Sequence, residues 1–211
     1  MGANYFNIHD LRIDGQHGSG RDSCPSGNNL SADGTGWTVA YVRSENSPCA
    51  NTAIGGTSFS FHDNYLVHSG SVGGPVGDGL DLFNLGFGGE IYNNTIADST
   101  DIGFISWGAQ GVHVHDNHID NTNFYGQAGF NVGSQGGHVP GDHTGSVYEN
   151  NSVTSAYNML GIGILLGAHP WSTDPGDDVT NAGTVINNSS SGAVINLMVE
   201  GIDLLGVFRT S

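Results

Sequence analysis

The feature that most constrains the fold is a short pattern that returns five times after residue 58. It consists of an apolar residue, any residue, Asp or Asn, then Asn, any residue and an apolar residue. The copies read FHDNYL, IYNNTI, VHDNHI, YENNSV and, altered at its end, VINNSS. Their second asparagines, spaced 30, 23, 34 and 37 residues apart, are Asn64, Asn94, Asn117, Asn151 and Asn188. A pattern that recurs every ~20–40 residues predicts stacked structural repeats.

A second series lies between these copies, in which a glycine opens an alternating apolar run. The runs are GLDLF, GFISW, GFNVG, GIGIL and GAVINL, and they open at Gly79, Gly103, Gly129, Gly161 and Gly192. Two interleaved series with matching uneven spacing indicate one repeated unit of short period-2 strands joined by turns. Because such a unit cannot bury its apolar face alone, we expect an all-β solenoid.

The charge of the chain excludes several classes of partner. Four Lys and Arg face 20 Asp and Glu, the formal net charge is −16, and the sequence contains no lysine. A chain this acidic cannot neutralise phosphates, so we expect no nucleic acid partner. The same deficit of basic residues argues against an anionic membrane surface. No run approaches the ~18 apolar residues of a membrane span.

The two cysteines bear on the compartment. Cys24 and Cys49 lie in a polar segment, each next to a proline. A disulfide between them is the preferred interpretation and favours an exported protein, while two unpaired surface thiols remain the alternative. The first residues show no signal peptide. We therefore expect a secreted or cell-surface bacterial protein whose export signal is not part of this sequence.

The repeats resemble the right-handed parallel β-helix superfamily of pectate-lyase-like proteins, closely over residues 59–200 and loosely over 1–58. The resemblance implies a right-handed single-stranded parallel β-helix (solenoid) of about six coils with an Asn ladder. Residues 1–211 would form one domain, with 1–58 an irregular first coil containing the cysteine loop, or a fragment of a longer chain. Asparagine tolerates the left-handed turn and its amide can bond the amide one coil above. The Asn-X-Thr/Ser strings therefore predict ladder turns rather than glycosylation.

The family's strand order predicts which side chains point inward. In each coil the Gly-led strand is the first, and the Asn turn joins the second and third. The predicted inward residues around the first Asn turn are Phe59, Phe61, Asn64 and Leu66. Two inward columns of the first sheet are predicted as Leu80, Phe104, Phe130, Ile162 and Val194, and as Leu82, Ser106, Val132, Ile164 and Asn196. The outward column is predicted as Asp81, Ile105, Asn131, Gly163 and Ile195.

Three long connections, 68–78, 134–145 and 167–183, should flank the first sheet and make a groove for a polysaccharide. The candidate catalytic acids on that sheet are Asp78, Asp81 and Asp101. Neighbouring strands lie ~4.8 Å apart, so these carboxyls can shift each other's pKa and supply the acid and base of glycoside hydrolysis. Plain turn chemistry is the alternative for Asp78 and Asp101.

Two strings, VGDGLDL and GFNVGSQG, are similar to the NTDGIDI and HGxSIGSxG elements of polygalacturonase-type glycoside hydrolases. The chain departs from these elements, because Asp101 is followed by Ile102, Ala128 stands in the His place, and no RIK element follows. The basic residue that binds galacturonate in that family therefore has no counterpart. A neutral glycan, or a calcium ion that bridges like charges, is expected instead.

Further candidate residues lie around the predicted groove. The predicted substrate-binding residues are Asp98, Trp107, Asn131, His138, His143, His169 and Trp171, with the tryptophans as sugar platforms. The loop DPGDD is a candidate calcium site through Asp174, Asp177 and Asp178, against a solvated acidic turn. The alternating His113, His115 and His118 could ligate a transition metal or simply form a soluble face.

The leading hypothesis is a carbohydrate-active protein that binds a polysaccharide or oligosaccharide, most plausibly a glycoside hydrolase that needs no cofactor. The alternatives are a calcium-dependent polysaccharide lyase and, from another class, a non-catalytic glycan-binding, adhesin or spike β-helix. Uncapped end coils would expose strand edges, so we also expect end-to-end self-association or a larger parent protein.

Overall fold

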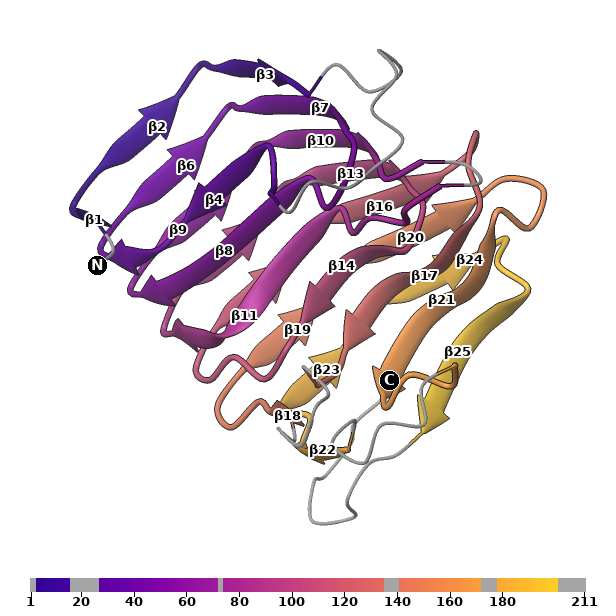
Figure 1. The fold of residues 1–211 in the computed structure, drawn as a ribbon. Helices are drawn as coiled ribbons and strands as arrows, with labels where there is room; N and C mark the ends of the chain where they lie inside the picture. The colour runs from indigo at the N-terminus through magenta and orange to yellow at the C-terminus, as the bar shows by residue number, and fades with distance from the viewer. Residues whose placement is uncertain (1–2, 16–26, 72–73, 135–140, 172–177, 201–211) are drawn as a thin grey trace.

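A computed structural model describes residues 3–15, 27–71, 74–134, 141–171 and 178–200. These residues form strands and turns, without a helix, and every pairing between the named strands is parallel. No helix able to cross a membrane occurs in this part of the chain. Figure 1 shows the strands of each sheet stacked in order from the N-terminal end of the molecule to β25.

Three large sheets share the chain. Sheet 1 contains β1 (Ala3–Asn4), β4 (Leu30–Ala32), β5 (Gly34–Thr35), β8 (Thr52–Thr57), β11 (Leu80–Phe87), β14 (Ile102–Ser106), β17 (Gly126–Val132), β21 (Leu160–Gly167) and β25 (Ile195–Glu200). Sheet 2 contains β2 (Asn7–His9), β6 (Thr38–Ala40), β9 (Ser60–His62), β12 (Glu90–Tyr92), β15 (His113–His115), β19 (Val147–Glu149) and β23 (Thr184–Ile186). Sheet 3 contains β3 (Arg12–Asp14), β7 (Arg43–Ser47), β10 (Tyr65–Ser69), β13 (Thr95–Ser99), β16 (His118–Asn121), β20 (Ser152–Ser155) and β24 (Ser189–Ser191). A small additional sheet pairs β18 (Gly141–Asp142) with β22 (Val179–Asn181).

Successive strands enter the three large sheets in turn. From β8 to β17, for example, the chain passes through sheets 1, 2 and 3 in that order and then returns to sheet 1 beside its previous strand there. This order explains why the two sequence series interleave, since each Gly-led run enters sheet 1 and each Asn pattern joins sheet 2 to sheet 3. The arrangement is consistent with a parallel β-helix or solenoid.

The predicted asparagine ladder is present. Asn94 Oδ1 accepts from Asn64 N and Asn64 Nδ2, both at 3.0 Å. Asn94 Nδ2 donates to Asn117 Oδ1 at 2.9 Å and to Phe61 O at 3.0 Å. Asn151 accepts and donates the same four kinds of bond two rungs further on. Each of these buried amides therefore has its full complement of partners.

The left-handed turn residue is the one before each ladder asparagine, not the ladder residue itself. These preceding residues have φ values of +54 to +56° and are Asp63, Asn93, Asp116, Asn150 and Asn187. Asp and Asn tolerate this conformation better than other residues with a Cβ. The Asp/Asn-Asn pair in the sequence pattern thus combines one residue for the turn with one for the ladder.

The inward positions around the first Asn turn agree with the prediction, since Phe59, Phe61 and Leu66 are buried in the core. In sheet 1 the predicted column holds through Leu80, Phe104 and Phe130. On the next strand, β21, the predicted register is wrong by two residues, because Phe130 pairs with Ile164 and not with Ile162. The observed inward columns end at Ile164 and Leu197, and at Leu166 and Val199, while the outward column continues from Asn131 to Leu165 and Met198.

A glycine explains the error in register. A Cβ on Gly129 would lie 2.5 Å from Val153 Cγ1 and 2.8 Å from Gly163 O, so this corner of the chain excludes a side chain. The string GIGIL offers two glycines, and Gly163 rather than Gly161 lies next to Gly129. The columns predicted to contain Ile162, Ile164 and Gly163 are therefore wrong beyond β17.

Sheet 1 is buried on both of its faces around β14. Besides the main core, a separate apolar cluster consists of Ile102, Ile105, Ala128, Ile162 and Leu165, with Trp107 and Met198 packed against it. We call the face of sheet 1 that bears Asp81 and Ile105 the outer face. The downstream part of this face is thus closed rather than an open groove.

Cys49 is buried and disulfide-bonded. Cys24 lies outside the described residues.

Candidate functional site

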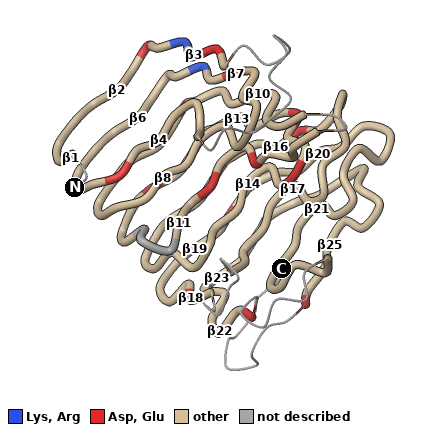
Figure 2. Tube along the Cα trace, in the orientation of Figure 1, with Lys and Arg blue, Asp and Glu red and all other residues tan. Residues whose placement is uncertain are grey.

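The three predicted catalytic acids come from two neighbouring strands of sheet 1. Asp81 is on β11, between Ala53 of β8 and Ile105 of β14. Asp78 and Asp101 lie in the turns that enter β11 and β14. Parallel strands lie ~4.8 Å apart, which brings the three carboxyls to one side of the sheet. Figure 2 marks acidic positions along sheet 1 in red, whereas the blue basic positions lie on β3 and β7.

Hydrogen bonds fix two of the three carboxyls. Asp78 Oδ1 accepts from Ile102 N at 2.9 Å, and the carboxyl groups of Asp78 and Asp81 lie close enough to shift each other's pKa. Asp101 Oδ1 accepts from Gln127 Nε2 at 2.8 Å. These bonds differ from the local turn chemistry considered for Asp78 and Asp101, because Asp78 ties its own turn to the next strand and Asp101 is held by a side chain of β17.

Burial disfavours the charged form of all three acids. It raises the pKa of Asp81 to about 6 and that of Asp101 to about 7, the latter with a contribution from the Asp78 charge. The pKa of Asp78 is raised well above its usual value by burial first and by Asp81 second. Asp78 keeps some exposed area as a residue, yet protein atoms surround its carboxyl. Both carboxyls of the Asp78–Asp81 pair are therefore harder to ionise than a free carboxyl.

Two buried polar atoms beside these acids have no hydrogen-bond partner, namely Asp81 Oδ1 and Trp107 Nε1. The indole lies close enough to Asp81 to lower its pKa, but the two atoms do not reach the geometry of a full hydrogen bond. Buried polar groups are nearly always paired in proteins. An unpaired acceptor and an unpaired donor thus lie close together here, both shielded from solvent.

Four of the predicted substrate-binding residues form one chain of contacts next to the acids. The Trp107 and His169 rings meet edge to face at 5.7 Å, and His169 stacks on Trp171 at 5.1 Å. His169 Nε2 donates to Asn131 Oδ1 at 3.0 Å. Trp171 keeps 43% of its surface exposed, so its ring remains available to a ligand. We call Trp107, Asn131, His169 and Trp171 the aromatic wall.

Two other predicted substrate-binding residues serve the fold. The carboxylate of Asp98 accepts from Thr122 N, Asn123 N and Asn123 Nδ2, which holds the turn after β16. His143 lies on the inner side of sheet 1, where it bonds the Tyr148 hydroxyl at 2.7 Å and Gly133 O at 2.8 Å. Burial lowers the pKa of His143 to about 4. His138 lies outside the described residues.

The predicted metal ligands do not assemble into a site in the described part of the chain. His113 Nε2 lies 2.8 Å from Glu149 Oε1, and His118 Nδ1 lies 2.9 Å from Ser152 Oγ. His115 belongs to a column of stacked rings with His62 and Tyr92. Among the described residues no group of three or more His, Cys, Asp or Glu is placed to hold a metal ion. Asp178 is exposed, while Asp174 and Asp177 lie outside the described ranges, so the calcium site stays a prediction.

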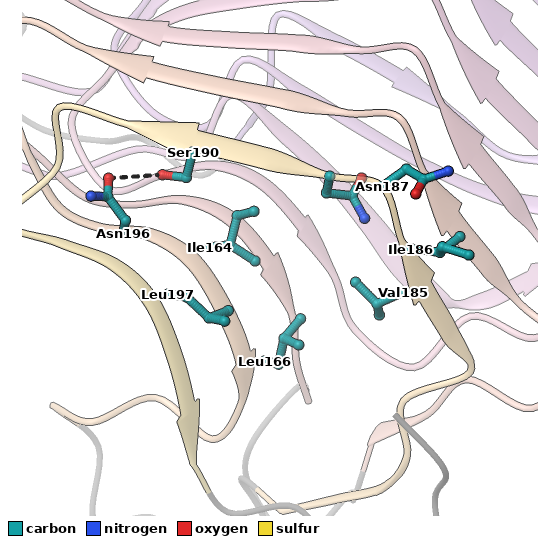
Figure 3. A pocket seen from close by; sticks show the side chains of 9 residues that line it. Ile164, Leu166, Val185, Ile186, Asn187, Ser190, Asn196 and Leu197 are labelled. Carbon is teal, nitrogen blue, oxygen red and sulfur yellow. Dashed lines mark hydrogen bonds between the residues drawn. The ribbon is translucent and has the colours of Figure 1, made fainter. Parts of the chain in front are cut away.

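A cavity of about 240 Å³ opens at the end of the molecule formed by β23, β24 and β25 (Figure 3). It is lined by apolar side chains of the core, including Ile164, Leu166 and Val185, together with polar side chains of Asn188 and Ser190. It carries no titratable side chain. This cavity is the open end of the core rather than a site for acid–base chemistry.

Sequence reasoning missed Gln127 and Phe83. Gln127 holds Asp101 from the next strand of sheet 1, and Phe83 lies two residues after Asp81 on the same strand and is 37% exposed. The period of two along β11 could have indicated Phe83 as an outward residue. No sequence pattern indicated Gln127, because it precedes the apolar run that opens at Gly129.

Comparison with known proteins finds no matching family model, no matching curated protein and no matching solved structure.

Proposed function

We propose that the chain is a right-handed single-stranded parallel β-helix of about six coils, secreted or at the cell surface, that binds a polysaccharide on the outer face of sheet 1. We further propose that it cleaves this polysaccharide as a glycoside hydrolase. The observation that carries the proposal is the buried Asp78–Asp81 pair with Asp101 beside it, next to an unpaired indole N–H and an aromatic wall.

The three acids divide the two roles that glycoside hydrolysis needs, a proton donor and an ionised carboxylate. Asp101, with its pKa raised to about 7, is still partly protonated at neutral pH and would protonate the glycosidic oxygen. In this proposal one carboxyl of the Asp78–Asp81 pair is ionised and carries a negative charge. That charge would stabilise the cationic sugar or activate a water molecule.

The aromatic wall supports the choice of a glycan. The faces of aromatic rings pack against the apolar faces of sugar rings, and Trp171 presents such a face beside the acids. His169 and Trp107 hold this ring in place through contacts of 5.1 and 5.7 Å. A sugar bound here would stack on the exposed part of the Trp171 ring.

The direct test measures reducing ends released from a panel of neutral and acidic polysaccharides. We expect Asp81→Asn and Asp101→Asn to lower the rate by roughly 10²–10⁴-fold, the usual contribution of a positioned acid or base. Asp116→Asn is the matched control, because Asp116 is an exposed turn residue between sheets 2 and 3 with a φ that asparagine tolerates. Wild-type rates in both site variants would refute the assignment.

A non-catalytic glycan-binding module is the second candidate, and the aromatic wall favours it as well. Stable glycan binding by the wild type, without any product after prolonged incubation, would support this alternative. A product that absorbs in the ultraviolet and disappears with a chelator would instead support a calcium-dependent lyase.

A further inference from the structure

A hollow of about 220 Å³ lies on sheet 1, upstream of the three acids. It is lined by Ser31, Ala32, Asp33, Ala53, Ile54, Gly55 and Phe83. Ser31 and Asp81 both pair with Ala53, one from each side, so the hollow borders the column that contains Asp81. Ser31, Asp33 and Phe83 are exposed, which places the mouth of the hollow on the outer face.

The hollow exists because residue 55 has no side chain. A Cβ on Gly55 would lie 3.8 Å from Asp33 Oδ1 and 4.0 Å from Phe83 Cβ, so it would project between these two side chains without a clash. Gly55 does not have the positive φ that favours glycine, in contrast to Gly56, which has a φ of +101° and whose Cβ would meet Gly34 O at 2.0 Å. The backbone requires Gly56, whereas Gly55 only keeps space open.

The hollow adjoins the proposed catalytic acids and the aromatic wall. Phe83 follows Asp81 by two residues on β11, a rise of about 7 Å along one face of a strand. On the next strand Ser106 pairs with Leu82, and Trp107 N donates to Leu82 O at 2.8 Å. Phe83 therefore stands between Gly55 on one side and Trp107 on the other.

We propose that this hollow, which we call the Phe83 hollow, is a subsite for one neutral sugar unit of the polysaccharide, next to the unit that is cleaved. The Phe83 ring offers an apolar face for a pyranose ring, and the Asp33 carboxylate and the Ser31 hydroxyl offer hydrogen bonds to its hydroxyls. The volume lies below the ~300–1,000 Å³ of pockets for drug-sized ligands, which fits a single ring rather than an oligomer. This inference rests on the proposed function.

The charges around the Phe83 hollow select a neutral sugar over a uronic acid. Asp33 places a carboxyl there, and the chain contains no lysine. In the described ranges the arginines are Arg12 and Arg43, which lie on sheet 3 and both pair with Glu45. A uronate in the hollow would meet like charge, and neither arginine of the described ranges lies there to offset it.

The experiment measures dissociation constants of the full chain for neutral oligosaccharides, namely cello-, xylo-, manno- and malto-oligosaccharides from disaccharide to hexasaccharide, and for oligogalacturonides. Gly55→Leu should fill the hollow and Phe83→Ala should remove its ring. We expect each to weaken binding of the longer neutral oligosaccharides by about tenfold or more, the usual loss for one apolar contact in a pocket. Asp116→Asn is the control and should bind as the wild type does, since Asp116 is an exposed turn residue between sheets 2 and 3, away from the hollow.

Asp33→Lys tests the charge argument and should strengthen oligogalacturonide binding while it leaves the fold intact, because Asp33 is exposed. Unchanged dissociation constants in Phe83→Ala, in a wild type that binds and cleaves neutral glycans, would overturn the subsite and leave the proposed function standing. Tighter binding of oligogalacturonides than of every neutral series by the wild type would overturn the neutral specificity. No binding or cleavage of any glycan by the wild type would overturn the proposed function itself. If Gly55→Leu does not fold, Phe83→Ala decides.

Discussion

Replacing Asn117 by alanine should destabilise the protein by about 4 kcal/mol. Asn117 Oδ1 accepts from Asn94 N at 3.1 Å and from Asn94 Nδ2 at 2.9 Å, inside the core. Alanine leaves both donors without this acceptor, and the rung of Asn151 loses one donor as well. A buried group without its partner costs ~1–3 kcal/mol, so the two donors of Asn94 together account for about 4. Since domains are stable by only ~5–15 kcal/mol, this loss is large.

The assay is urea denaturation followed by circular dichroism, with the free energy of unfolding obtained by linear extrapolation. Asn188→Ala is the matched control, because Asn188 ends the observed ladder, accepts the same two bonds from Asn151 and is only half-buried. Water can replace its amide there, so we expect less than half the loss. A cost below about 1 kcal/mol for Asn117→Ala, or equal costs for the two variants, would refute the reasoning, as satisfied buried amides would then not matter to stability.

Three further predictions follow from the burial described above. The pKa values of Asp81 and Asp101 are raised in the folded state, so their contribution to stability is full below pH ~4 and is lost as the pH rises toward about 6–7. The pKa of His143 is lowered to about 4, so its contribution to stability is lost as the pH falls below ~6.5. Melting temperatures against pH should therefore change slope in opposite directions in Asp101→Asn and His143→Gln, and unchanged slopes would contradict this. Gly129→Ala should lower the melting temperature by more than ~5 °C because its Cβ meets Gly163 O at 2.8 Å, whereas Gly55→Ala should not. Because Leu197 and Val199 of β25 are exposed, light scattering should show concentration-dependent association, and a monomer at every concentration would contradict this.

The sequence predicts the parts of this fold that are set locally and repeated. The Asp/Asn-Asn pairs encode a turn and a ladder rung within two residues, so the ladder could be predicted rung by rung. The register beyond β17 could not, because Gly161 and Gly163 satisfy the same local rule. Only the contact of Gly129 with the carbonyl of Gly163, from a different coil, decides between them.

The candidate site divides in a similar way. The grouping of Asp78, Asp81 and Asp101 follows from the repeat and the parallel register. The inward position of His143 does not, because its loop has no period and its partners Tyr148 and Gly133 come from elsewhere in the chain. The Phe83 hollow could not be predicted from the sequence either, because the sequence does not distinguish a glycine that leaves space for a ligand from a glycine that makes a turn.

The asparagine ladder also gives the molecule a direction. Between successive ladder asparagines from Asn64 to Asn188, the Nδ2 of the N-terminal residue donates to the Oδ1 of the C-terminal one. The amide dipoles therefore add head to tail, and each rung polarises the next. A duplicated coil inserted anywhere in the asparagine ladder would orient its amide as its neighbours do, whatever the length of its loops. Spacings of 23 and 37 residues can thus coexist in one chain, and loops above sheet 1 can lengthen without disturbing the stack.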